Sequence, residues 1–362
     1  MLPEPFQRWV EQIVGVVPDP EKPSTCSSCA MCAPGGSQGA DTVDDHSPTP
    51  DPHIYFDPVA RCCTYCPQLP NFLVGSLFTD PDPALNFGRE TVARRVEEGD
   101  ASLLGVRIDP SYLSLYGNAA PTSFGQAPSL RCPHHRGEDG GCGIWKHRPA
   151  VCATWFCKFE RGAVGRRMWQ GIFELLNEAE RAISLWCLEQ LEVEPSARIR
   201  AVADLGAEFG AARLERKRDP GRDEEIWGEW VGREIEFYVA CAKLVEDLQW
   251  EDVVRFGGAQ LSTLAGHVES LLLGHQDRSI PHTLRAGTFV VLGSWNERMW
   301  LGGYNDYDPL EVGPEVLSLV ARCDGRETAV ITAEHRAASG RHPDRILLRT
   351  LLDHGILVGA GA

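Results

Sequence analysis

The stretch GGCGIWKHRPAVCATWFCK, residues 140 to 158, places Cys142, Cys152 and Cys157 around an Arg-Pro pair and a Trp-Phe pair. The chain has 362 residues and 13 cysteines, and most of the cysteines lie in its first half. The early ones are Cys26, Cys29, Cys32, Cys62, Cys63, Cys66, Cys132, Cys142, Cys152 and Cys157. The later three lie in apolar periodic segments and are typical of small buried hydrophobic side chains. The early thiols are therefore the candidates for a structural, catalytic or metal-binding role.

The composition is that of a globular protein, with 43% hydrophobic and 24% charged residues. The formal net charge of −16 disfavours nucleic acid or anionic lipid as a partner, because binding to phosphate depends on clustered Lys and Arg. No apolar run reaches the roughly 18 residues that span a bilayer, so we expect no membrane segment. The first residues lack a basic leader and a small-residue cleavage site, so we expect a cytoplasmic protein. Because cytosolic thiols are kept reduced, a disulfide framework is disfavoured.

The pattern of apolar and breaker residues predicts an α+β fold that is mostly helical, in four parts. Residues 1–23 are predicted to form an amphipathic helix, and residues 24–166 a loop-rich cysteine-cluster domain that binds metal. Residues 167–275 are predicted to form a helical domain, and residues 280–362 a small α+β unit. The arm at residues 18–53 is rich in Pro, Gly, Ser and Asp and cannot bury a core.

The helix predictions depend on apolar residues that recur every three or four positions. In the first segment these are Phe6, Trp9, Val10, Ile13, Val14 and Val17. We expect this stripe to pack on the body of the protein rather than on a membrane. The same spacing from Met168 to Leu191 predicts a helix of more than five turns, and shorter patterns predict helices at about 223–246 and 250–273.

The early cysteines have the spacing of metal ligands. CSSCAMC, residues 26–32, is C-x2-C-x2-C, although the fourth ligand of a bacterial ferredoxin run would be Gly36 here. RCCTYCP, residues 61–67, contains a C-x2-C pair, which is typical of half a zinc or iron–sulfur site. LRCPHHRGEDGGC, residues 130–142, adds two cysteines, with His134 and His135 as candidate nitrogen ligands. We therefore predict that all ten early cysteines are metal ligands.

A nucleophilic cysteine is the weaker alternative, because no lone cysteine stands apart from the cluster. His147 lies near Cys152 in the sequence and is the candidate base for that chemistry. The chain has no C-x3-C-x2-C motif, so a radical mechanism that uses S-adenosylmethionine is not supported. The phosphate-loop motif and the H-E-x-x-H motif are also absent from the sequence.

The second half of the cysteine region resembles the YkgJ-like cysteine-cluster family of zinc- or iron-chelating proteins. That family pairs an early C-x2-C-x2-C-C block with a later Cys-x-Ile-Tyr, an Arg-Pro-x-x-Cys and a final Cys. The corresponding residues here are Cys142, Ile144 and Trp145, then Arg148, Pro149 and Cys152, and finally Cys157, with Cys132 before them. CSSCAMC and CCTYC are both candidates for the early block. The resemblance covers roughly residues 24 to 160 and implies a metal site; the flagellin lysine N-methylases of the family imply an iron–sulfur cluster and methyl transfer.

Thiol number leaves iron and zinc both open, because a zinc site and an iron–sulfur cluster each need about four ligands. Residues 131 to 167 contain eight Lys or Arg against three acidic residues. Such cations would offset the negative charge of a thiolate-ligated cluster, although an exposed basic face or an anionic-substrate site would show the same pattern. We favour a 4Fe-4S iron–sulfur cluster, with zinc as the alternative. Arg148, His147 and Trp155 are the residues predicted to lie directly behind the ligands.

The C-terminal segment has three candidate strands after residue 286, followed by helical patterns in PEVLSLVARCDG, ETAVITAEHRAA and DRILLRTLLDHG. Asp324 and Gly325 are predicted to close the first of these helices. The order is similar to PqqD-like domains, small winged-helix-type modules that bind leader peptides along a strand edge. The resemblance implies a peptide or protein substrate at this unit, whereas packing or dimerisation is the plainer alternative.

Two functions follow as hypotheses. The first is a cytoplasmic metalloprotein with one or two cysteine-ligated iron–sulfur clusters that modifies a peptide or protein, or transfers electrons. The second is a non-catalytic, zinc-stabilised binding or scaffold module. Metal content and colour distinguish the two.

Overall fold

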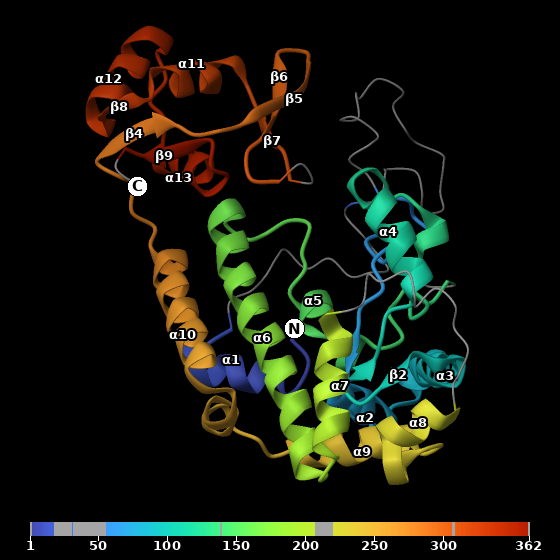
Figure 1. Ribbon diagram of the computed structural model, residues 1–362. Coiled ribbons are helices and arrows are strands. Elements are labelled where there is room, and N and C mark those ends of the chain that lie inside the picture. Colours follow the sequence, from blue (N-terminus) through green and yellow to red (C-terminus); the bar gives the residue numbers. More distant parts are fainter. Residues whose placement is uncertain are drawn as a thin grey trace.

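Helices make up most of the structure, as the repeated apolar spacing predicts. The computed structural model describes residues 2–17, 31, 56–137, 140–206, 220–305 and 308–360 (Figure 1). Its helical body contains α1 (Phe6–Val14), α2 (Asn71–Thr79), α3 (Asn86–Arg95), α4 (Pro110–Ser123), α5 (Ala150–Ala153), α6 (Gly162–Gln190), α7 (Pro195–Gly206), α8 (Pro220–Trp227), α9 (Glu234–Val245) and α10 (Trp250–Gln276). A small unit of helices and strands follows α10. The predicted α+β class with mostly helical structure is confirmed.

The long helix α6 runs through the middle of the helical body, beside α10 (Figure 1). Its buried face includes Met168, Ile172, Leu175 and Ile183, none of which is exposed to solvent. Burying four such side chains contributes on the order of 1.5–3 kcal/mol each. The helix predicted from Met168 is confirmed, although it begins earlier, at Gly162.

Helix α1 packs on the same core. Phe6, Trp9 and Val10 are fully buried, and the indole Nε1 of Trp9 donates a hydrogen bond to the carbonyl of Leu248 at 2.9 Å. The predicted packing of the N-terminal stripe on the body is confirmed. Side chains from the predicted segments 1–23, 24–166 and 167–275 all enter this one core.

Helices α2 and α9 lie in close contact because Gly75 has no side chain. A Cβ atom at Gly75 would overlap the backbone carbonyl oxygen of Tyr238 on α9. The hydroxyl of Tyr238 in turn donates to the carbonyl of Ser102 at 2.8 Å. The helical body is thus joined to the small sheet formed by β1 (Leu69–Pro70), β2 (Ala101–Ser102) and β3 (Gly105–Val106), in the order β1-β3-β2.

The single helix predicted at about 223–246 is divided in the structure. Helix α8 ends at Trp227, a 3-10 turn spans Gly228–Trp230, and α9 begins at Glu234. Gly228 and Gly232 have φ values of +54° and +72°, which a right-handed helix cannot contain. The helix predicted at 250–273 corresponds to α10, which is kinked at Gly258, where φ is +72°.

The C-terminal unit has a core of its own, which includes Leu284, Leu301, Leu319, Ile331 and Leu351. Its elements are β4 (Thr283–Ala286), β5 (Val290–Trp295), β6 (Arg298–Gly302), β7 (Leu310–Val312), α11 (Pro314–Arg322), β8 (Asp324–Glu327), α12 (Thr328–Ser339), α13 (Arg345–Asp353) and β9 (Leu357–Gly359). Two antiparallel sheets have the strand orders β8-β4-β9 and β5-β6-β7.

One boundary in this unit differs from the prediction. The helix expected to close at Asp324 and Gly325 ends earlier, at Arg322, and both residues belong to strand β8. The strand pairs with β4, where Asp324 lies opposite Arg285. Gly325 has a φ of +101°, so its conformational freedom serves the strand and not a helix end.

A buried ion pair joins the C-terminal unit to the helical body. Arg161, which precedes α6, donates to both carboxylate oxygens of Asp353 at 3.2 and 2.8 Å and also to the carbonyl of His275. Arg349 donates to the same carboxylate at 2.7 Å. The arginine side chain of the pair is 3% exposed and that of the aspartate 11%, so the two parts are held at a defined contact.

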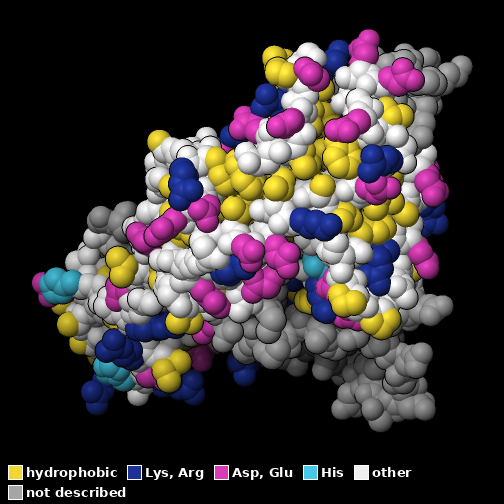
Figure 2. Space-filling model, turned by 90° about the horizontal axis from the view of Figure 1, so that it is seen from below, with side chains coloured by type: hydrophobic (Ala, Val, Ile, Leu, Met, Phe, Trp, Pro, Cys, Tyr) yellow, Lys and Arg dark blue, Asp and Glu magenta, His cyan; other side chains and the backbone are white. Residues whose placement is uncertain are grey.

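The opposite end of the body is formed by α7, α8 and α9 (Figure 1). Figure 2 views the molecule from that side and shows hydrophobic side chains gathered among charged ones. Ile199 and Val202 on α7 and Val231 before α9 are among the exposed apolar residues of the chain. None of the helices in the described ranges is both long and apolar enough to cross a membrane.

Candidate metal centre

A tight turn positions the first pair of cysteines. The carboxylate of Asp57 accepts from the amide of Val59 at 2.7 Å, and its carbonyl accepts from the amide of Arg61 at 2.7 Å. The turn leads directly into Cys62 and Cys63. The carbonyl of Cys63 accepts from the amide of Cys132 at 2.7 Å, so the two cysteine segments are hydrogen-bonded through their backbones.

A short hairpin brings Cys132 and Cys142 to the same place. The amide of Arg136 donates to the carbonyl of Gly141 at 2.8 Å, and the amide of Gly143 donates to the carbonyl of His134 at 2.8 Å. His135 and Cys142 form an isolated antiparallel bridge. Two cysteines that are ten positions apart in the sequence therefore lie at the open end of one turn.

Cys152 lies on the single-turn helix α5, which packs on α6. The carboxylate of Glu180 on α6 accepts a hydrogen bond from the amide of Ala150, the first residue of α5, at 2.7 Å. Glu180 is 7% exposed, and its burial raises the pKa of its carboxyl group to about 8. A buried acid thus fixes the start of the helix that carries Cys152.

Four thiols are linked by pairwise electrostatic interactions, and this set is called the thiol ring below. Cys66 and Cys132 share a side-chain hydrogen bond, and Cys142 acts electrostatically on Cys132. Cys152 is in turn acted on by Cys142 and by Cys66. The ring draws on three separate segments: the turn after residue 60, the hairpin and α5. A second pair is attached to it, because Cys62 shares a hydrogen bond with Cys63 and also acts on Cys152.

The environment of the ring shifts its thiol pKa values in opposite directions. The hydrogen bond from Cys132 lowers the pKa of Cys66 and raises that of Cys132, which is the behaviour of a thiol that donates to a thiolate. Burial raises the pKa of Cys152 well above its ordinary value. Cys132 and Cys152 are therefore protonated at neutral pH, and a metal ion would have to displace their protons.

Within the described ranges, no three His, Cys, Asp or Glu side chains surround one point in the geometry of a metal site. Cys66, Cys132, Cys142 and Cys152 nevertheless match a thiolate-ligated metal group in donor type and in number. They act on one another in pairs. Binding a metal would require the four side chains to turn toward a common centre. The donor set therefore fits such a group.

Four predicted ligands remain. Cys26, Cys29 and Cys32 fall outside the described residues. Met31, between two of them, is buried, and its carbonyl accepts from the amide of Phe56 at 2.7 Å, near the turn that leads to Cys62. The carbonyl of Cys157 accepts from the side-chain amide of Asn305 at 2.6 Å.

Arg148 lies beside the thiols, where its positive charge opposes the upward shifts in the pKa of Cys62 and Cys152. Its guanidinium carbon lies 3.4 Å from the ring centroid of Trp145, and the Arg148 residue is 8% exposed. The stacking holds the cation in place. Trp155 is 46% exposed and packs edge-on against Phe124, with 5.4 Å between the ring centroids.

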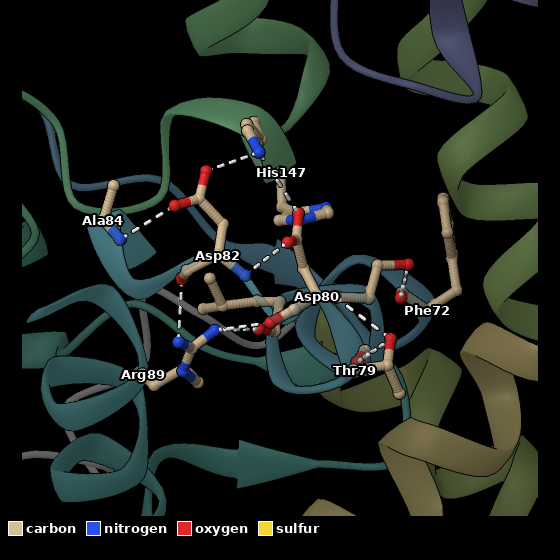
Figure 3. Close-up of polar contacts among 11 residues, drawn as sticks. Phe72, Thr79, Asp80, Asp82, Ala84, Arg89 and His147 are labelled. Carbon is tan, nitrogen blue, oxygen red and sulfur yellow. Dashed lines mark hydrogen bonds and ion pairs between the residues drawn. The ribbon is translucent and has the colours of Figure 1, made fainter. Parts of the chain in front are cut away.

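His147 is bound to an aspartate and is not placed to act as the base for Cys152. Its Nε2 lies 3.0 Å from the Oδ2 atom of Asp80 at the end of α2, while the neighbouring Lys146 is 2.5 Å from Asp82. Figure 3 shows His147 over Asp80 and the Asp82 carboxylate turned toward Ala84. These contacts hold Lys146 and His147, directly before Arg148, against the segment that ends α2. Because the pKa of the Cys152 thiol is raised, the structure gives no support to an activated cysteine with His147 as its base.

His134 is not available as a metal ligand, contrary to the prediction from its position beside Cys132. Its Nε2 lies 3.0 Å from Nη1 of Arg95, and its Nδ1 lies 2.9 Å from the hydroxyl of Thr91. Because arginine can only donate, Nε2 accepts and Nδ1 carries the proton. Burial and the positive charge of Arg95 lower the pKa of His134 to about 3, so it stays neutral. Both ring nitrogens are occupied by protein.

Two residues of this region have no signal in the cysteine motifs. Arg95 on α3 lies beside His134 and Cys66, and Glu180 on α6 contacts the start of α5. Both come from helices that are distant in sequence from the cysteines they approach. The one sequence feature that could have indicated Arg95 and Glu180 is a charged residue on the apolar face of a predicted helix. No family model, curated protein or solved structure matches this chain.

Proposed function

We propose that this chain binds a cysteine-ligated iron–sulfur cluster through Cys66, Cys132, Cys142 and Cys152. The observation that carries the proposal is that separate segments bring these cysteines together: Cys66 packs with Cys132 in one small core, the amide of Cys132 donates to the carbonyl of Cys63, and the hairpin closes at His135 and Cys142. Cys152 interacts electrostatically with Cys142 and Cys66. Four thiolates are the usual ligand set of a 4Fe-4S cluster, and such a cluster, when bound, supplies one-electron transfer. Cys62 and Cys63 lie next to the ring and supply further thiols.

The surroundings of the thiols support a bound metal group. The local core consists of Cys66, Ile108 and Cys132 with a few half-buried neighbours. So small a core stabilises its loops weakly by burial alone. A metal ligated from three segments would join the turn, the hairpin and α5, and its binding free energy would add to folding.

Charge also supports an anionic group at this position. Four thiolates around a cluster leave net negative charge, which a buried cation offsets. Arg148 acts on two of the neighbouring thiols and is held by its stacking on Trp145. An arginine remains charged at every pH at which the protein is folded, so the compensation is permanent.

The C-terminal unit fits the role of a docking module for a peptide or protein substrate. Tyr304 and Asn305 contact the segment that ends the cysteine region: the hydroxyl of Tyr304 accepts from the amide of Phe159 at 3.2 Å. Strand β5 lies at an edge of its sheet, with Val290 and Val291 more than half exposed. An extended peptide can add to such an edge through main-chain hydrogen bonds. We propose that a substrate bound there is presented to the cysteine region for modification or electron transfer.

The ligand assignment is tested by single substitutions in anaerobically purified protein. Cys66→Ser and Cys142→Ser should each lower the metal content several-fold and reduce solubility, because each removes a thiolate from the set. Cys187→Ser is the matched control, because Cys187 is also a buried thiol but lies on α6 in the main core. Full metal content in Cys66→Ser would contradict the ligand set.

A zinc-stabilised scaffold is the second candidate, favoured by the same small local core. It uses the same four thiols, so the substitutions above do not separate the two functions. Zinc with four thiolates is colourless and holds no sulfide, whereas an iron–sulfur cluster absorbs visible light and releases sulfide in acid. Metal and sulfide analysis of the wild-type protein decides between them.

A further inference from the structure

Arg95 is a buried arginine on α3 that no cysteine motif indicates. It is 5% exposed, and its guanidinium is bound on three sides by protein. Nε donates to the Oδ2 atom of Asp100 at 3.4 Å, Nη1 donates to Nε2 of His134 at 3.0 Å, and Nη2 donates to the carbonyl of Arg107. A charge that is this strongly buried costs free energy unless each of its donors has a partner. Its position is therefore closely defined.

The contact with His134 connects Arg95 to the hairpin of the thiol ring. The carbonyl of His134 accepts from the amide of Gly143, which follows Cys142, and His134 lies two positions after Cys132. The other ring nitrogen of His134 is held by Thr91, whose hydroxyl donates to the carbonyl of Gly88 at 2.9 Å. Helix α3 thus holds the imidazole from both sides. The imidazole fixes the hairpin between the two cysteines.

Arg95 also brings a positive charge to the thiols. Its guanidinium lies 3.0 Å from the imidazole of His134, two positions after Cys132, and both side chains are buried, so solvent screens the charge little. Because Asp100 is paired with the guanidinium, part of the charge is offset locally. Arg148 follows the hairpin in the sequence and acts on Cys62 and Cys152. The two arginines therefore approach the thiols from different segments of the chain.

We propose that Arg95 is a positioning residue of the thiol site, which anchors the Cys132–Cys142 hairpin through His134 and places a permanent positive charge beside that hairpin. The anchoring role concerns the protein with or without metal. The electrostatic role depends on the proposed function, because it concerns a bound thiolate group. The two roles are separated by different substitutions.

The anchoring role is tested in metal-free protein by the alkylation rates of individual cysteines, measured by mass spectrometry. In Arg95→Met, and in Thr91→Val, Cys132 and Cys142 should react about tenfold faster or more. Each substitution removes a contact of His134, so the hairpin opens locally at a lower free-energy cost. Arg89→Met is the matched control: Arg89 also lies on α3 and donates to backbone carbonyls, those of Leu77, Asp80 and Asp82. Wild-type alkylation rates in both test variants would overturn the anchoring role.

The electrostatic role is tested in metal-loaded protein. Arg95→Met should weaken metal binding about tenfold to a hundredfold in competition with a chelator, as loss of a partner behind the ligands usually does. If the metal is an iron–sulfur cluster, its reduction potential should also fall, since the cation favours the more negative, reduced state. Arg95→Lys should restore most of both losses because it keeps the charge, and Thr91→Val should leave the potential unchanged.

Unchanged affinity in Arg95→Met, with an unchanged potential where iron is bound, would overturn the electrostatic role. Wild-type protein that binds neither iron nor zinc would instead overturn the proposed function, and with it the electrostatic role. The alkylation rates would still decide the anchoring role in that case.

Discussion

Glu180 provides a test of the contact between α6 and the helix that carries Cys152. Burial raises the pKa of its carboxyl group in the folded protein to about 8, against an ordinary value of 4.5, even though the amide of Ala150 donates to it. Between these two values the folded state holds a proton that the unfolded state has lost. Its contribution to stability is therefore fully present below pH 4.5 and is lost as the pH rises toward 8.

The magnitude follows from proton linkage. Each pH unit between the two pKa values corresponds to about 1.4 kcal/mol of unfolding free energy. From pH 5 to pH 7 the free energy of unfolding of the wild type should therefore fall by roughly 2 to 3 kcal/mol through this group. Glu180→Gln keeps an oxygen that can accept from Ala150 and removes the titration. The variant should therefore become more stable relative to wild type by that amount as the pH rises.

The assay is urea unfolding at pH 5, 6, 7 and 8, followed by circular dichroism for both proteins. Glu174→Gln is the matched control, because it makes the same change on the exposed face of the same helix. A difference between Glu180→Gln and wild type that stays constant from pH 5 to pH 8 would refute the reasoning. It would mean that water or a rearranged side chain solvates the carboxylate in the folded protein.

Two further substitutions test the packing of the fold. Arg161→Met breaks the buried pair with Asp353 and should destabilise the protein by about 3–5 kcal/mol; Arg326→Met, at an exposed ion pair, should leave urea unfolding nearly unchanged, and equal effects would contradict the buried pair. Gly75→Ala forces α2 away from α9 and should lower stability by about 3 kcal/mol or more. Gly266→Ala, at an exposed helical position with open space around it, should raise stability by about 0.5–1 kcal/mol. The melting temperature should therefore fall in Gly75→Ala and rise in Gly266→Ala.

The helices were predictable where one face is continuously buried. The stripes at Phe6 and Met168 gave elements close to those observed, because the 3.6-residue period directly reflects burial in the core. The predicted helix at 223–246 was wrong in its middle, since the positive φ values of Gly228 and Gly232 depend on how the chain turns between helices. Strand β8, with the sequence DGRE, has no apolar alternation and forms because β4 pairs with it.

Cysteine spacing indicated which segments would meet but not which thiols would face each other. The ring joins Cys66, Cys132, Cys142 and Cys152, which lie on segments that only the tertiary fold brings together. His134 has the sequence context of a ligand, yet a buried arginine and a threonine occupy its ring. Those partners come from α3, some 40 positions earlier, and local spacing carries no information about them.

The central claim is that the four-thiol ring holds an iron–sulfur cluster, and the most direct test is the iron, zinc and acid-labile sulfide content of anaerobically purified protein. If the ring holds such a cluster, the protein is expected to be brown, with iron and sulfide in near-equal amounts and broad absorption at roughly 400 nm. The same measurement on a variant with Cys66, Cys132, Cys142 and Cys152 all replaced by serine should show neither. Colourless wild-type protein with stoichiometric zinc, or with no metal at all, would contradict the claim.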